Sequence, residues 1–349
     1  MAARANVPLR IVQLVPAERG GVRDHAEGLA LEWSRRGISS ELIAFDAAAA
    51  RSASLATRLL QSAPEGEPSR VLLHYSGYGY ARRGLAFWLL RELEQARRAL
   101  GPRCRFVAMV HELFVSGAPW QPAFWLGRLQ AHVVQRAVRL CDAVVTNSSH
   151  HGAWLAAQVR HDTDVRVSPV FSNVGEPAGV LTASARDSGL VVFGSASTRQ
   201  RAFDRLEPHL AELRALGVQH VVEAGPGPAS AFAGNSLQRS HAGELAPSQI
   251  EALLQRHRYG LIDYPSFHLG KSGVFAAYAA HGCIVLDTAP HPVHADGLGS
   301  GRHYVTLGQG AGARLTRSFE DAMARRLRTW YFAHRRSQQA SRFLADLLG

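Results

Sequence analysis

Lysine is almost absent from this sequence, although the chain is strongly basic. Its 349 residues include 39 Lys plus Arg, of which only Lys271 is lysine and 38 are arginine, and the formal net charge is +11. Such a balance favours anionic partners: nucleotides, anionic membrane surfaces or nucleic acid. Lys271 is either a chance remnant or a position that needs a compact ammonium group instead of a planar guanidinium.

Cysteine is also scarce, and long hydrophobic runs are missing. Cys104, Cys141 and Cys283 are odd in number and far apart, which predicts reduced thiols in a cytosolic protein. No charge-free apolar run of about 18 residues occurs, and residues 1–10 lack a secretory signal, so we expect no membrane-spanning helix. The prediction is a cytoplasmic protein, with peripheral contact at the inner face of an anionic membrane left open by the charge.

Two further absences concern ligands. The arginines are spread along the chain and form no nucleic-acid module, so we predict no nucleic-acid partner. The 17 histidines show no metal-ligand spacing, and the pair Asp162 and Asp164 is interpreted as a solvated loop. The prediction is therefore no metal and no cofactor.

Short apolar runs alternate with helical patterns along the whole chain, which indicates an α/β protein with parallel sheets. The length favours two domains. We expect an N-terminal Rossmann-like domain over residues 1–172, a Gly/Pro-rich linker over 173–187, a second such domain over 188–317 and a C-terminal helical segment over 318–349. Expected strands are 9–15, 40–45, 71–75, 106–111, 143–146, 190–193, 218–224, 259–263 and 283–287, and expected helices include 24–36, 82–100, 122–140, 202–216, 247–257, 271–281 and 318–348.

The strongest candidate site is the segment Tyr264-Pro-Ser-Phe-His-Leu-Gly-Lys-Ser-Gly273, between an expected strand and an expected helix. Exposed N–H groups at a helix start attract anions. Gly270 and Gly273 allow a phosphate to approach the backbone, Ser272 can donate a hydrogen bond, and Lys271 supplies a full charge. A P-loop would need glycine where this sequence has Pro265, so a P-loop NTPase is disfavoured.

Other candidates lie at the ends of expected strands. Arg199 and Arg201 follow the strand that ends at Gly194, and either could contact a diphosphate at the next helix start. The pair Gly20 and Gly21 follows the first strand and could let the backbone approach a ligand. His111, followed by Glu112, ends the fourth strand and could contact a sugar hydroxyl.

With these elements in place, the chain resembles GT-B glycosyltransferases, specifically the retaining family 4 group. The similarity is carried in order by Gly20–Gly37, Val110–Leu113, Ala143–Ser148, Val192–Gly194, Glu223–Gly227, Gly243–Leu245, Tyr264–Ser266 and Ala279–Gly282. The resemblance implies that Gly225, Glu244 and Leu245 line a nucleotide pocket. Where that family carries two glutamates eight residues apart, this sequence has Leu269 and Ala277.

The resemblance implies two Rossmann-like domains facing across a cleft, with the C-terminal helix packing back toward the first domain. The implied activity is a retaining, metal-independent transfer from a nucleotide-diphospho-sugar donor to a glycan, lipid-linked or small-molecule acceptor. Lys271, Ser272, Gly273 and one of the two arginines would hold the diphosphate, with the acceptor near Gly20, Gly21 and His111.

Three alternatives stay open. The missing glutamates favour a non-catalytic GT-B-like binding or scaffold protein. A sugar-nucleotide epimerase or a phosphate-handling NTPase could use similar domains. A nucleic-acid binder is the least favoured and predicts steep salt dependence of binding.

Overall fold

The computed structural model describes residues 9–62, 69–232, 237–308 and 316–349. The chain forms two compact units: unit 1 comprises Met1–Ser168 and Arg336–Gly349, and unit 2 comprises Pro169–Arg335. Residues 173–187, expected as a linker, lie inside unit 2, and the expected C-terminal segment is divided between the units. Within the described residues, no helix has both the length and the hydrophobicity that a membrane span requires.

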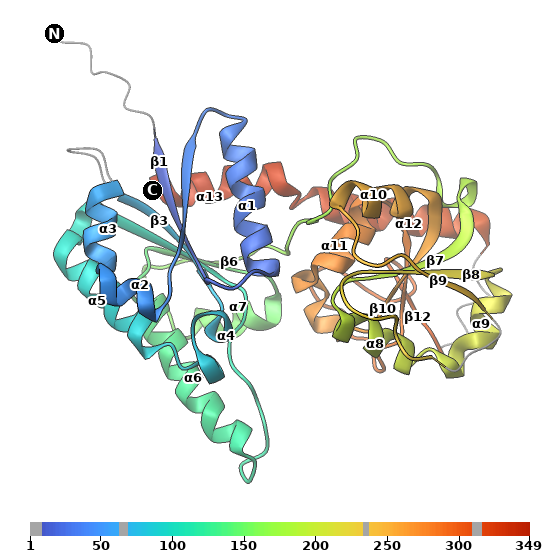
Figure 1. The fold of residues 1–349 in the computed structure, drawn as a ribbon, viewed down its shortest axis with the longest axis horizontal. Coiled ribbons are helices and arrows are strands. Elements are labelled where there is room, and N and C mark those ends of the chain that lie inside the picture. Colours follow the sequence, from blue (N-terminus) through green and yellow to red (C-terminus); the bar gives the residue numbers. More distant parts are fainter. Residues whose placement is uncertain (1–8, 63–68, 233–236, 309–315) are drawn as a thin grey trace. The chain divides into compact units, whose positions relative to one another are not determined.

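Unit 1 is built on a parallel six-stranded sheet in the order β2-β1-β3-β4-β5-β6 (Figure 1). Its central strands are nearly continuous runs of buried Val, Leu, Ile and Ala, as expected for a parallel sheet covered on both faces. The strands are β1 Arg10–Val15, β2 Ser39–Ala44, β3 Ser69–Tyr75, β4 Cys104–Val110, β5 Ala143–Thr146 and β6 Val165–Val167.

Helices cover both faces of this sheet, and one of them comes from the other end of the chain. Helix α13 (Arg336–Leu348, red in Figure 1) lies beside α1 (Gly21–Ser34, blue). Trp33 Nε1 donates to the carbonyl of Ala340 at 2.9 Å, which holds the two helices together. The expected packing of the C-terminal helix against the first domain is confirmed. The remaining helices are α2 Ala47–Ser52, α3 Leu55–Ser62, α4 Gly77–Tyr80, α5 Phe87–Leu100, α6 Pro122–Val138 and α7 Ser149–Ala156.

Unit 2 repeats the architecture with a parallel sheet in the order β12-β11-β10-β7-β8-β9. The edge strands β9 and β12 were not predicted, because the first is polar and the second has only two residues. The strands are β7 Asp187–Phe193, β8 His220–Ala224, β9 Gln238–His241, β10 His257–Ile262, β11 Ile284–Asp287 and β12 Val305–Thr306, and the helices are α8 Ala196–Asp204, α9 Leu210–Ala215, α10 Pro247–Arg256, α11 Gly273–Ala280 and α12 Arg317–Phe332.

Several expected helices have different bounds. The expected helix 82–100 begins only at Phe87, after a 3₁₀ turn over Arg82–Gly84 in which Arg83 has a φ of +61°. The expected helix 202–216 is two helices, α8 and α9, because Ser195 Oγ caps a helix that starts earlier and Pro208 lies in the turn between them. The expected helix start at Lys271 is wrong: that residue ends a 3₁₀ turn, Ser266–Lys271, and α11 starts at Gly273. The expected helix 318–348 is interrupted between α12 and α13.

Candidate functional site

Two sets of candidate residues lie at the carboxyl ends of the two sheets. In unit 2, strands β7, β8, β10 and β11 are parallel neighbours, so the residues that follow them meet at one edge of the sheet. Ligands of open parallel α/β sheets bind at this edge. It carries Gly194, Gly225, Asp263, Asp287 and Thr288, followed by the starts of helices α8 and α11.

The start of α11 keeps the features of an anion site. Ser272 Oγ accepts a hydrogen bond from Phe275 N at 3.2 Å, which caps the helix while the hydroxyl proton can still be donated. Gly273 is the first helical residue, and the half-buried Lys271 precedes the cap. Gly270 is buried, and its carbonyl accepts from Val170 N at 2.8 Å. Three of the four predicted residues, Lys271, Ser272 and Gly273, therefore lie at the helix start. Gly270 is instead buried in the 3₁₀ turn that precedes the helix.

Arg199 does not have the position that the sequence suggested. Its side chain is fully buried; Nε donates to Glu223 Oε1 at 2.8 Å, and Nη1 donates to the carbonyl of Gly194 at 2.7 Å. Nη2 donates to the carbonyls of Pro226 and Pro228. Every guanidinium nitrogen is thus engaged inside the protein, which argues against direct diphosphate contact by Arg199.

The other arginines of this region are open to solvent. Arg201 is exposed but lies in the last turn of α8, because the helix begins at Ala196 and not near residue 202. Arg205, which the sequence analysis missed, places Nη1 at 3.7 Å from Asp263 Oδ1, next to the end of β10. No motif marks Arg205; only the folding of the segment after α8 brings it to the strand end.

The residues expected to line the nucleotide pocket come close together. Gly225 N donates to the carbonyl of Gly243 at 2.7 Å, and Glu244 and Leu245 follow directly. Gly225 has a φ of +143°, and a Cβ there would lie 2.1 Å from the carbonyl oxygen of Gly194, so only glycine fits. Glu244 is exposed and Leu245 is half-buried.

Asp287 is a second residue that the sequence analysis missed. It ends β11 and is 1% exposed. Burial raises its pKa to about 7, although the backbone N–H groups of Ala289 and Tyr264 donate to Oδ1 and oppose the shift. Loss of solvation disfavours the carboxylate, so Asp287 holds its proton to near-neutral pH. No periodicity could reveal this, because the burial comes from the surrounding loops.

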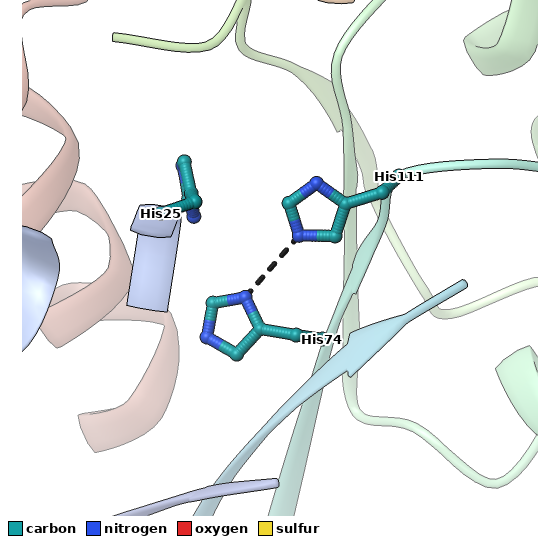
Figure 2. A group of neighbouring side chains, drawn as sticks. All are labelled: His25, His74 and His111. Carbon is teal, nitrogen blue, oxygen red and sulfur yellow. Dashed lines mark hydrogen bonds between the residues drawn. The ribbon is translucent and has the colours of Figure 1, made fainter. Parts of the chain in front are cut away.

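The carboxyl edge of the unit 1 sheet is occupied by imidazoles. His111, the predicted strand-end histidine, follows β4, and its Nε2 lies 3.2 Å from Nδ1 of His74 on β3. Figure 2 shows these two rings with the ring of His25, from α1, turned edge-on toward them. All three side chains are buried. Only His111 could be predicted from the sequence, because sheet pairing and helix packing, not sequence spacing, unite the three.

The remaining predicted residues of unit 1 surround this edge. Gly20 and Gly21 are exposed at the start of α1, and a Cβ at either would meet no atom within 4 Å. The backbone there is therefore open to a ligand. Glu112 is half-buried and accepts a hydrogen bond from Ser76 Oγ at 2.9 Å, which orients its carboxylate.

The sequence matches no protein-family model and no curated protein. Several solved structures match nearly the whole chain. An alpha-glucosyltransferase (AGT) in complex with UDP has a TM-score of 0.58 at 12% identity, over 97% of this chain and 99% of that chain. An alpha,alpha-trehalose 6-phosphate synthase from Burkholderia multivorans has a TM-score of 0.59 at 12% identity, over 98% of each chain. The pneumococcal O-GlcNAc transferase GtfA, with UDP and GlcNAc, has a TM-score of 0.55 at 10% identity, over 98% of this chain and 99% of that chain.

The chain has the GT-B fold. At such low identity the similarity establishes the architecture, and the chemistry has to be argued from the residues. In this GT-B chain Leu269 and Ala277 are buried apolar residues, 1% and 0% exposed. The two positions that the resemblance aligned with glutamates therefore offer no carboxylate, and Asp263, Asp287 and Glu244 are acids at or near the carboxyl edge of the unit 2 sheet.

Proposed function

We propose that the protein is a glycosyltransferase that takes a sugar from a nucleotide diphosphate bound by unit 2. The observation that carries this proposal is the start of α11. There the chain's only lysine, a capping serine and a glycine backbone lie at the carboxyl edge of the unit 2 sheet, the edge at which open parallel α/β sheets generally bind ligands. UDP is the first nucleotide to test, since several of the matched structures, AGT and GtfA among them, were solved with it.

In this proposal the residues at α11 hold the diphosphate. Lys271 provides a full positive charge, Ser272 donates its hydroxyl proton, and the N–H groups at Gly273 add the positive end of the helix dipole. Charge grows on the diphosphate as the glycosidic bond breaks, so donors aimed there lower the barrier. We propose that the transfer retains the anomeric configuration and uses no metal ion at the diphosphate.

The acceptor would bind unit 1 near Gly20, Gly21, His111 and Glu112. Glu112 could accept a hydrogen bond from a sugar hydroxyl, because a carboxylate has several acceptor sites and the hydrogen bond from Ser76 orients it. We propose a glycan or lipid-linked acceptor. Several matched alpha-glucosyltransferase structures contain DNA, in one case DNA with an abasic site, so DNA belongs in the acceptor panel.

Nucleotide binding to Lys271→Ala tests the proposal. Calorimetry should show UDP affinity falling about 10- to 100-fold, because a hydrogen bond to a charged group contributes about 1.5–3 kcal/mol. Arg256→Ala is the matched control: it removes one positive charge from the same unit, at an exposed pair with Asp187 on the opposite edge of the sheet. Its affinity should equal that of the parent protein.

Two results would contradict the proposal. Equal UDP affinity in Lys271→Ala and Arg256→Ala would remove the diphosphate role. Absence of stabilisation by UDP, GDP and ADP in a thermal-shift screen would remove nucleotide binding altogether. Nucleotide binding without transfer or hydrolysis, across a panel of nucleotide sugars, would favour the non-catalytic alternative.

A further inference from the structure

We propose that His25, His74 and His111 form a binding site for a divalent transition metal ion of the zinc type. The three belong to separate elements, α1, β3 and the end of β4. Each ring contributes one nitrogen to a set whose members all lie within 4.8 Å of one another. This proposal does not depend on glycosyl transfer, and it replaces the expectation of no metal that the histidine spacing suggested.

The geometry suits a tetrahedral ion. Zinc–imidazole bonds of about 2.0–2.1 Å place two ligand nitrogens roughly 3.3 Å apart. Nδ1 of His74 and Nε2 of His111 are already 3.2 Å apart (Figure 2). His25 completes the set: its ligand nitrogen lies within 4.8 Å of those of the other two rings, and its ring centroid lies 5.6 Å from that of His74 and 5.2 Å from that of His111.

Two glutamines orient the rings. Gln13 Nε2 donates to the carbonyl of Ala26 and to Ser40 Oγ, so its Oε1 is the atom that faces His74 Nε2 at 2.9 Å. His74 must therefore donate from Nε2, which leaves the lone pair of the neutral ring on Nδ1, toward His111.

Gln339 of α13 acts in the same way on His25. Its Oε1 lies 3.1 Å from His25 Nε2, so Nε2 donates and the lone pair is on Nδ1. Metal-binding histidines in proteins characteristically donate their other N–H to such a partner, which fixes the tautomer and the ring orientation.

The contacts with Gln13 and Gln339 hold the ring protons of His74 and His25 on Nε2, so each neutral ring keeps its lone pair on Nδ1. Without metal, His111 Nε2–H donates to His74 Nδ1. With metal, His111 takes its other neutral tautomer, with the proton on Nδ1, so three neutral imidazoles ligate and no net proton is released. Three imidazoles leave a fourth position for water or a substrate oxygen.

Metal titration of the full chain, purified without a histidine tag and treated with a chelator, tests the proposal. We expect one equivalent of Zn²⁺ per chain by elemental analysis. Bound Co²⁺ should give the intense visible absorption of a four-coordinate ion. His111→Gln should abolish that absorption and weaken Zn²⁺ binding by more than the roughly 10- to 100-fold that loss of a second-shell partner costs.

Two further variants guard against misleading results. His257→Gln is the matched control, because His257 is also buried but makes an edge-to-face contact with His220 and belongs to no three-residue metal-ligand group among the described residues; it should bind Zn²⁺ like the parent. Gln339→Met should weaken Zn²⁺ binding about tenfold while leaving all three ligands in place.

Two results would overturn the proposal. One is a parent protein that binds no Zn²⁺ and gives no four-coordinate Co²⁺ spectrum. The other is equal Zn²⁺ binding by the parent and His111→Gln.

Discussion

The two units share one architecture but differ in what they place at the carboxyl edge of the sheet. The edge of unit 1 carries three buried imidazoles, whereas the edge of unit 2 carries glycine backbone, a lysine, arginines and buried acids. Neutral imidazoles suit a metal ion or a hydroxyl group, and cations at helix starts suit a diphosphate. We therefore propose one ligand position in each unit, with the side chains at each edge deciding which ligand fits.

The largest effect should come from the buried ion pair in unit 2. Glu223→Gln would leave the fully buried Arg199 guanidinium without its carboxylate, which should cost about 3–5 kcal/mol in the free energy of unfolding. Asp187→Asn, at the exposed pair with Arg256, should cost less than about 1 kcal/mol. Urea denaturation measures both. Equal losses would show that burial of the pair does not matter.

The second-largest effect is a pH dependence of stability, which should have opposite signs for two acids of the unit 2 sheet, Glu223 and Asp287. Burial opposes the charge on Glu223, but hydrogen bonds from Ser230 and Arg199 outweigh it and lower the net pKa below 4.5. Its stabilisation is therefore present above pH 4.5 and is lost as the pH falls through the folded-state pKa. Asp287 has the opposite sign, with a pKa raised from 3.8 to about 7.

Asp287 titrates near pH 3.8 in the unfolded chain and near pH 7 in the folded protein. Between these two pH values the folded state keeps the Asp287 proton that the unfolded state has released, so the free energy of unfolding falls as the pH rises. Above pH 7 the loss of unfolding free energy that results from burying the charged Asp287 carboxylate is constant and on the order of 4 kcal/mol. Asp287→Asn keeps the acceptor oxygen and removes this cost. Its melting temperature should exceed that of the parent at pH 8 and match it at pH 4. A parallel pH profile for the two proteins would contradict the assignment.

The smallest effect compares two helix caps, one in each unit. Ser272 caps α11 and Ser148 caps α7, both helices have eight residues, and the cap distances are 3.2 and 3.3 Å. Alanine at either position should cost about 1 kcal/mol of stability. Only Ser272→Ala should also weaken UDP binding, by about fivefold to tenfold for one lost hydrogen bond. Equal nucleotide affinity in both variants would leave Ser272 a purely structural cap.

Much of the fold could be predicted from local patterns. The apolar runs 9–15, 106–111, 143–146 and 190–193 predicted four strands. The structure has β1, β4, β5 and β7 at these places, with bounds that differ by at most three residues. The edge strands β9 and β12 escaped prediction because an edge strand needs no apolar run. The start of α8 escaped because the cap at Ser195 lies in a polar segment with no hydrophobic period.

The sequence by itself determined the alternation of strands and helices, the two parallel sheets and the unusual position of Lys271, since these depend on periodicity, composition and neighbouring residues. Only the tertiary structure decided which side chains meet. It buried Arg199 against Glu223, raised the pKa of Asp287 by removing water, and joined three histidines from separate elements. Burial and proximity across a sheet arise from residues far apart in the chain, so no local pattern encodes them.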